Sequence, residues 1–272
     1  MPAPKNAMEI FRLLNQSNCR ECGEKTCLAF AGAVYQNRRQ LADCPHLEPA
    51  VIERYRDAAD APSPLEAEGE AYLQALLAQV QDLDFVEAAR RTGGELRNGK
   101  LTLKVLGKDL SVDRQGRLSA DIHVNPWVAT PYLNYLLHSQ GRLPSGNWVP
   151  FRELEGGRER AALFQKRCEL ELKKLADRST DFFDDIIHMF SGKQVARQFA
   201  ADISVVLHPL PRVPLMICYW KPEDGLGSSL NLFFDQTADA NLDIGSLFSI
   251  GAGIALMFHK LSLRHGFSSA QS

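Results

Sequence analysis

Four of the six cysteines lie close together near the N-terminus. They are Cys19, Cys22, Cys27 and Cys44, spaced Cys-x2-Cys-x4-Cys-x16-Cys-Pro. A cubane cluster needs one terminal thiolate for each of its irons, and a two-residue gap lets neighbouring cysteines reach two irons on one face of the cube. The spacing therefore predicts a [4Fe–4S] cofactor with these four cysteines as its metal ligands.

Residues between the cysteines suit an anionic cluster. Gly23 can adopt positive φ and let the backbone approach the inorganic sulfides, which accept N–H hydrogen bonds. Thr26 is a good capping residue, and the helix that it predicts would direct free N–H groups toward negative charge. We expect N–H···S bonds from the 20–28 loop and shielding by Phe30 and Leu41 to set the reduction potential.

Zinc is the alternative occupant, because four cysteines also make a tetrahedral site. Such sites typically use two Cys-x2-Cys pairs, and this sequence has one. Pro45 follows the last cysteine, as in the bacterial ferredoxin run. The pattern favours a four-iron cluster, while spacing alone leaves zinc and a two-iron cluster open.

The remaining chemical groups give weaker patterns. Cys168 and Cys218 lie in apolar segments and are predicted to be buried core thiols. Four polar residues at predicted element ends could line a pocket, although capping and loop contacts explain them as well: Asp202, His208, Asp235 and His259. Asp202 and Asp235 flank strands that could be neighbours. Four basic residues near the cysteines could dock an acidic redox partner or simply face solvent: Arg20, Lys25, Arg38 and Arg39.

Composition limits the function classes. Of 272 residues, 45% are apolar, and 31 basic against 33 acidic residues give a net charge of −2. No positive field favours nucleic-acid binding. The longest apolar run, 244–257, is shorter than the ~20 residues that cross a bilayer, which predicts a packing helix and no membrane span. The N-terminus lacks a secretory pattern, so we expect a cytoplasmic protein in which clustered cysteines bind metal.

The cysteines must be positioned by a small helical domain, 1–60. Periodicity predicts helices at 7–14, 26–35 and 48–56, with the second helix bracketed by the cysteines. Residues 57–64 have the small, polar, proline-containing composition of a linker.

A larger domain, 65–272, is predicted to be α+β with an antiparallel or mixed sheet. Its expected helices are 65–91 with a break near 81–84, 126–138, one or two within 158–190, and 242–265. Its expected strands are 101–105, 110–112, 118–124, a short piece at 147–151, 203–207, 213–220 and 230–234. The strand 213–220 is apolar on both faces, as a central strand should be. Gly251 and Gly253 are expected to allow close helix packing.

Residues 7–48, with Asn18-Cys-Arg-Glu-Cys-Gly-Glu-Lys-Thr-Cys27 and Asp43-Cys-Pro45, resemble the cluster domain of the corrinoid iron–sulfur protein large subunit. The resemblance implies a low-potential, one-electron donor that returns over-oxidised cobalamin to Co(I). The long barrel and the corrinoid-binding domain of that family would not fit in the remaining ~210 residues of this pattern. Residues 65–270 resemble an uncharacterised domain that occurs beside such clusters in anaerobes.

Three hypotheses follow. The favoured one is an electron-transfer or redox-accessory protein that serves a corrinoid-dependent or other anaerobic redox partner. The second is a reductase whose C-terminal domain binds a small substrate or cofactor. The third is a non-catalytic assembly or binding module with a structural cluster or zinc. No motif for dinucleotide, P-loop or serine-hydrolase chemistry occurs.

Overall fold

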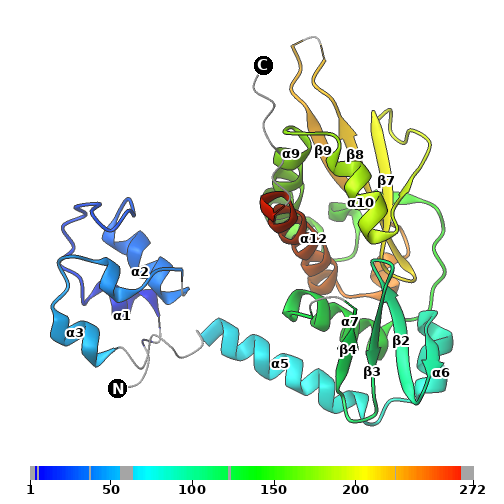
Figure 1. The fold of residues 1–272 in the computed structure, drawn as a ribbon, viewed down its shortest axis with the longest axis horizontal. Helices are drawn as coiled ribbons and strands as arrows, with labels where there is room; N and C mark the ends of the chain where they lie inside the picture. The colour runs from blue at the N-terminus through cyan, green and yellow to red at the C-terminus, as the bar shows by residue number, and fades with distance from the viewer. Residues whose placement is uncertain are drawn as a thin grey trace. The chain divides into compact units, whose positions relative to one another are not determined.

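The protein is described by a computed structural model. The described residues are 4, 6–36, 38–55, 64–121, 124–223 and 225–264. The chain divides into two compact units, residues 1–72 and 73–272 (Figure 1). The predicted linker 57–64 lies outside the described residues except for Pro64, so the predicted domain limits of 1–60 and 65–272 stay a prediction.

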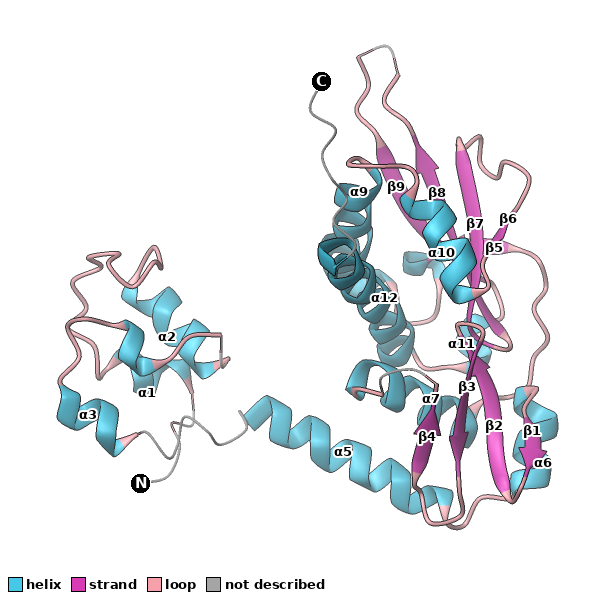
Figure 2. Ribbon diagram, viewed as in Figure 1, coloured by secondary structure: helices cyan, strands magenta, loops and turns pink. Residues whose placement is uncertain are grey.

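The N-terminal unit is helical (Figure 2). It contains α1 (Ala7–Phe11), α2 (Cys27–Tyr35), the 3-10 turn η1 (Leu41–Asp43) and α3 (Pro49–Arg54). The predicted helix 7–14 ends early, because the N–H groups of Leu13 and Leu14 bond carbonyls three residues back and Gln16 is left-handed. Leu14 nevertheless stays buried.

One small core holds this unit together. Its buried members are Ile10, Leu14, Cys27, Phe30, Ala31, Leu41, Cys44 and Leu47. Two of the four N-terminal cysteines therefore belong to the core of the unit itself. Because so few apolar side chains are buried, the unit has little hydrophobic stabilisation of its own.

Two helices precede a four-stranded antiparallel sheet in the order β1-β2-β3-β4, and the first of them, α5, begins within the residues of the smaller unit. The elements are α5 (Pro64–Val80), α6 (Phe85–Thr92), β1 (Glu95–Arg97), β2 (Lys100–Val105), β3 (Lys108–Val112) and β4 (Leu118–Ala120). The predicted break at 81–84 is confirmed: Asp84 caps α6, and Gly93 ends it with a φ of 74°. The strand predicted at 118–124 stops at Ala120, and residues 122–123 lie outside the described ones.

A second antiparallel sheet has the order β5-β9-β8-β7-β6. Its strands are β5 (Trp148–Pro150), β6 (Lys193–Gln194), β7 (Ile203–Leu210), β8 (Val213–Trp220) and β9 (Ser229–Asp235). The predicted central strand is β8, buried from Val213 to Tyr219. The α+β class is confirmed, and both sheets are antiparallel.

Helices α9 (Leu170–Ala176) and α10 (Phe182–Phe190) pack on this second sheet (Figure 2). Helix α7 (Pro126–His138) lies beside the first sheet instead, where the Tyr132 hydroxyl donates to the carbonyls of Leu101 and Leu110. The other elements are α8 (Ala161–Phe164), α11 (Ala238–Asn241) and α12 (Ile244–Arg264), with 3-10 turns η2 (Phe151–Glu153) and η3 (Arg158–Arg160). The prediction of one or two helices within 158–190 was too low, because a π-helical turn, Gln165–Glu169, separates α8 from α9 and a further break precedes α10.

The last helix, α12, is a core helix. Among the described residues it alone is long and apolar enough to cross a membrane, judged by length and composition only, and its apolar part, Ile244–Ser262, exceeds the predicted run 244–257. Leu247, Ile254 and Phe258 are buried in the main core of the larger unit. The prediction of a packing helix is confirmed for this face.

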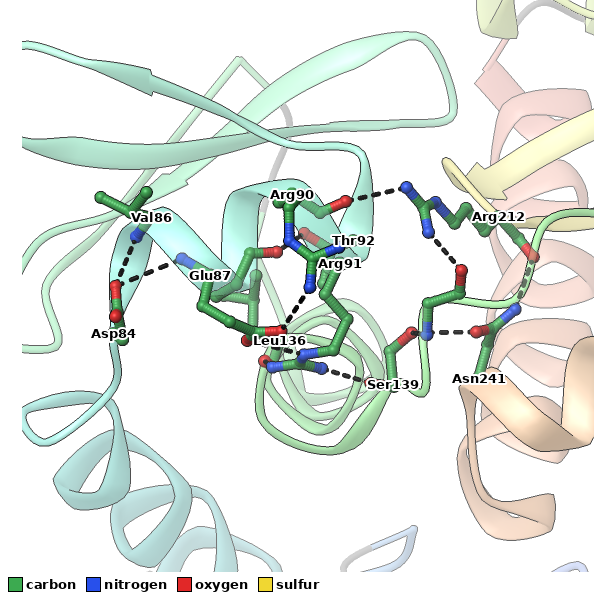
Figure 3. A network of polar contacts seen from close by, with 12 residues as sticks. Asp84, Val86, Glu87, Arg90, Arg91, Thr92, Leu136, Ser139, Arg212 and Asn241 are labelled. Carbon is green, nitrogen blue, oxygen red and sulfur yellow. Dashed lines mark hydrogen bonds and ion pairs between the residues drawn. The ribbon is translucent and has the colours of Figure 1, made fainter.

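Two arginines join the elements of the larger unit (Figure 3). Arg91 on α6 donates to the carbonyls of Leu136 and Ser139 at the end of α7. Arg212, in the β7–β8 turn, donates to the carbonyls of Arg90 and Gly141. These guanidinium groups satisfy carbonyls at helix ends and in a loop, so the network is structural.

Candidate metal centre

The four predicted ligands occupy positions of graded exposure. Cys19 and Cys22 lie on the loop between α1 and α2, Cys27 is the first residue of α2, and Cys44 caps η1. Cys27 and Cys44 are each 7% exposed, Cys22 is half-buried, and Cys19 is exposed. The cysteines bracket α2, as predicted, and Cys19 is the one of the four that is exposed.

The loop that carries the first two cysteines has an unusual backbone. Gln16, Asn18 and Arg20 have φ values of 57°, 52° and 67°, and Gly23 has 81°. The positive φ predicted for Gly23 is confirmed. Left-handed geometry is unfavourable for residues with a Cβ. A loop with three such residues therefore keeps this backbone only because contacts with its surroundings stabilise it.

Asn18 and Cys27 form a reciprocal pair. The Asn18 N–H donates to Cys27 Sγ over 3.3 Å, and the Cys27 N–H donates to Asn18 Oδ1 over 2.8 Å. Thr26 caps α2, as predicted, by accepting from the Ala29 N–H at 3.0 Å. The N–H···S contact and the helix N-terminus both stabilise negative charge on this sulfur. Sequence reasoning did not single out Asn18, although Asn tolerates left-handed φ.

A second group lies at the exposed cysteine. Ligand atoms of Cys19, Glu21 and His46 lie within 4.8 Å of one another. Glu21 Oε2 is 3.2 Å from His46 Nε2. Neither Glu21 nor His46 was predicted, because the sequence separates His46 from Cys19 and only the fold brings them together.

The basic residues near the cysteines are exposed: Arg20, Lys25, Arg38 and Arg39. Arg39 Nε is 3.8 Å from Glu24 Oε1, and its Nη2 lies 2.9 Å from the point where a Cβ on Gly23 would stand. Arg38 donates to Gln36 Oε1 at 3.0 Å. Part of this charge is therefore engaged locally, and the docking role stays a prediction.

Four polar residues were predicted either to line a pocket or to serve in capping and loop contacts: Asp202, His208, Asp235 and His259. The structure favours capping and loop contacts for Asp202 and Asp235. The prediction that strands beside Asp202 and Asp235 are neighbours was wrong, because β8 lies between β7 and β9. Ile203 pairs with Tyr219 and Phe234 pairs with Leu215, so the two carboxylates stand at opposite ends of β8. His208 and His259 are exposed.

Asp235 accepts hydrogen bonds from two loops instead, at residues 145–146 and at residue 237. It is fully buried, and its two oxygens accept from the backbone N–H groups of Ser145, Gly146 and Thr237 and from both hydroxyls. Burial raises the pKa of the Asp235 carboxyl, but these donors more than offset that effect and the pKa lies below its ordinary value. Asp202 accepts from the Lys221 N–H at 2.8 Å.

The other two cysteines are core thiols, as predicted. Cys168 and Cys218 are both 0% exposed, and burial raises the pKa of each thiol. Cys168 lies beside Gly251, whose missing Cβ leaves room for Phe164 and the Cys168 sulfur. The expected close packing at Gly251 is confirmed. Neutral, buried thiols of this kind are inert.

A hollow in the larger unit lies between α10 and α12. Its lining is Phe182, Asp185, Ile186, Met189, Phe190, Phe258, Leu261 and Ser262. Only two of these side chains are polar, and neither belongs to the residues predicted from the sequence. The lining therefore offers little acid–base chemistry, and the metal centre is the stronger candidate site.

Comparison with known protein families gives a match for the larger unit. Residues 84–257 match the family model of a domain of unknown function, DUF3786. The chain belongs to the DUF3786 family. The match covers the four-stranded sheet, the second sheet and most of α12. No solved structure matches the DUF3786 chain.

The N-terminal unit resembles a different group. Residues 14–46 match the family model of an Fe-S cluster domain. The corrinoid/iron-sulfur protein large subunit of Moorella thermoacetica is 42% identical over 59 residues, 22% of this chain and 13% of that protein. The acetyl-CoA decarbonylase/synthase complex subunit gamma of Methanocaldococcus jannaschii is 35% identical over 54 residues, 20% of this chain and 11% of that protein.

These matches support an iron–sulfur cofactor in the N-terminal unit, and the resemblance predicted from the sequence is confirmed. The chain spans only about an eighth of the length of these relatives. The likeness is therefore to their cluster domain, and it excludes the larger, DUF3786 part of this chain.

Proposed function

We propose that this DUF3786 protein carries one [4Fe–4S] cluster on Cys19, Cys22, Cys27 and Cys44 and acts as an electron-transfer or redox-accessory protein. The observation that carries the proposal is the N-terminus of α2, where Cys27 Sγ accepts an N–H bond from a loop that also holds Cys19 and Cys22. Thiolates, an inward N–H donor and a positive-φ glycine together suit an anionic cluster.

The surroundings suit outer-sphere electron transfer. Phe30 and Leu41, 1% and 5% exposed, lie in the same core as Cys27 and Cys44. Their burial excludes water from one side of the centre and so influences its potential. The exposed Cys19 edge provides an approach for a partner. The bound cluster would supply the one-electron chemistry.

We infer that the partner is a protein of an anaerobic, corrinoid-dependent system. The relatives that share this unit are named as a corrinoid/iron-sulfur protein subunit and as subunits of an acetyl-CoA decarbonylase/synthase complex. Such a partner places the protein in the reducing cytoplasm, where thiolates persist. Membrane and nucleic-acid partners have no role in this proposal.

The decisive experiment is iron and sulfide analysis of the anaerobically purified chain, with EPR spectra before and after dithionite reduction. We expect about four irons and four sulfides per chain and a reduced S = 1/2 signal. One zinc without sulfide would contradict the proposal and favour the assembly-module alternative. Substrate-dependent oxidation of the reduced cluster, with no partner protein added, would instead favour the reductase alternative.

A further inference from the structure

The exposed corner of the centre has a second donor close by. His, Cys, Asp and Glu side chains can all bind a metal ion. Within the part of the chain that the structure describes, one group of three such side chains has its ligand atoms within 4.8 Å of one another: Cys19, Glu21 and His46. Cys27 and Cys44 instead lie in the core, surrounded by apolar side chains. The exposed ligand is therefore the one with an alternative beside it.

The separation suits two donors that serve one metal. Bond lengths of about 2.3 Å to sulfur and 2.1 Å to an imidazole nitrogen allow the two atoms to stand up to about 4.4 Å apart around one ion. The ligand atoms of Cys19 and His46 lie within 4.8 Å of each other, which is close to that span. Glu21 Oε2, 3.2 Å from His46 Nε2, is the kind of carboxylate that orients metal-ligating imidazoles.

We propose that His46 is a reserve ligand for the iron that Cys19 holds, so that this corner of the cluster is exchangeable. This inference rests on the proposed function, because it presumes the four-iron cluster. In the exchange the bond from iron to Cys19 Sγ breaks, a bond from iron to a His46 nitrogen forms, and the thiolate takes a proton from solvent. The iron keeps its oxidation state.

The test compares full-length chains labelled with 15N-histidine and reconstituted anaerobically with iron and sulfide. In Cys19→Ala, we expect about four irons per chain and a reduced EPR signal with a 15N hyperfine coupling that the unsubstituted chain lacks. In Cys19→Ala/His46→Ala, we expect about three irons and an oxidised three-iron signal. Both residues are exposed, so thermal unfolding should show that the units still fold.

Two control variants sharpen the result. Cys19→Ala/Glu21→Gln should keep four irons, since Glu21 orients the imidazole and does not replace it. His46→Ala alone should keep the unsubstituted chain's iron content and signal. A three-iron centre in Cys19→Ala, or a four-iron centre there without 15N coupling, would overturn the His46 assignment while leaving the cluster intact. An unsubstituted chain without iron and sulfide would overturn the proposed function as well.

Discussion

At the scale of single residues, burial separates the cysteines by role. Cys27 and Cys44 are ligand candidates inside the small core, Cys19 is exposed, and Cys168 and Cys218 are core thiols of the DUF3786 unit. Cys27 differs from the two core thiols in that its sulfur accepts a backbone N–H bond, from Asn18, at the start of a helix.

Cys27→Ser should abolish the four-iron centre. Cys27 is buried and accepts an N–H bond from Asn18, and among the described residues it belongs to no group of three His, Cys, Asp or Glu ligand atoms like the one at Cys19. We expect loss of the cluster or conversion to about three irons, measured as iron, sulfide and EPR signal. Cys168→Ala is the matched control, a buried thiol that should leave the iron content unchanged. A normal four-iron spectrum in Cys27→Ser would refute the ligand assignment.

Asp235→Asn should destabilise the DUF3786 unit at neutral pH. An amide leaves at least one partly buried donor of the 145–146 loop without its carboxylate partner, which costs about 1–3 kcal/mol of unfolding free energy. Because the folded pKa is lowered, the carboxylate stabilises the protein above its unfolded pKa of about 3.9, and this stabilisation is lost as pH falls through the folded value.

Urea unfolding at pH 7 and at acidic pH checks both points: the gap between Asp235→Asn and the unsubstituted chain should narrow below about pH 3.9. Asp202→Asn is the control, since Asp202 is half-buried and accepts a backbone N–H bond from Lys221. A change below about 1 kcal/mol is expected there. If the two substitutions lowered the unfolding free energy equally, the additional hydrogen bonds of Asp235 would make no extra contribution to stability.

At the scale of elements, packing decides which glycines are needed. In α12, a Cβ on Gly251 would stand 2.6 Å from Phe164 Cε2 and 3.2 Å from Cys168 Sγ. The Phe164 ring is stacked on Phe151 with centroids 4.0 Å apart, so it has little freedom to move. The glycine brings α12 close to the π-helical turn, at the expense of helix propensity.

Gly251→Ala should therefore lower stability despite alanine's better helix propensity. Overpacking costs about 1–3 kcal/mol and the propensity gain returns about 1 kcal/mol, so we expect a net loss of up to about 2 kcal/mol in chemical unfolding. Gly69→Ala in α5, where nothing lies within 4 Å of the added Cβ, should be neutral or stabilising. If Gly251→Ala stabilised the protein, the side chains of Phe164 and Cys168 would have to move and make room for the added Cβ.

At the scale of the whole molecule, the two units have separate cores of very different size. The small unit buries few apolar side chains, and two of those are the cysteines Cys27 and Cys44. Metal binding in such a unit contributes directly to folding free energy. The DUF3786 unit has two sheets and its own large core, so its stability should be independent of the metal.

Removal of the cluster should loosen the N-terminal unit alone. After chelation of iron under oxidising conditions, we expect hydrogen exchange to accelerate at backbone amides of α1 and α2, while protection of β7, β8 and β9 stays unchanged. Mass spectrometry of peptides from both units measures this difference. Simultaneous loss of protection in the β8 peptides would show that the units unfold as one.

Local signals in the sequence were sufficient for the ligand pattern, the cap at Thr26, the turn at Gly23, the two buried thiols and most element positions. Spacing, capping and periodicity depend on residues near one another in the chain, and so they are visible there. Helix lengths were less certain: α1 ended early, and the π-helical turn Gln165–Glu169 divided a segment predicted to be more continuous.

Only the tertiary structure decided what distant residues do together. It separated Asp202 from Asp235 by placing β8 between their strands, and it brought His46 to Cys19. Strand order and loop contacts depend on which apolar faces pack, and that is a property of the whole core. The sequence by itself therefore determined the predicted ligands and their local geometry, while packing determined which other side chains surround them.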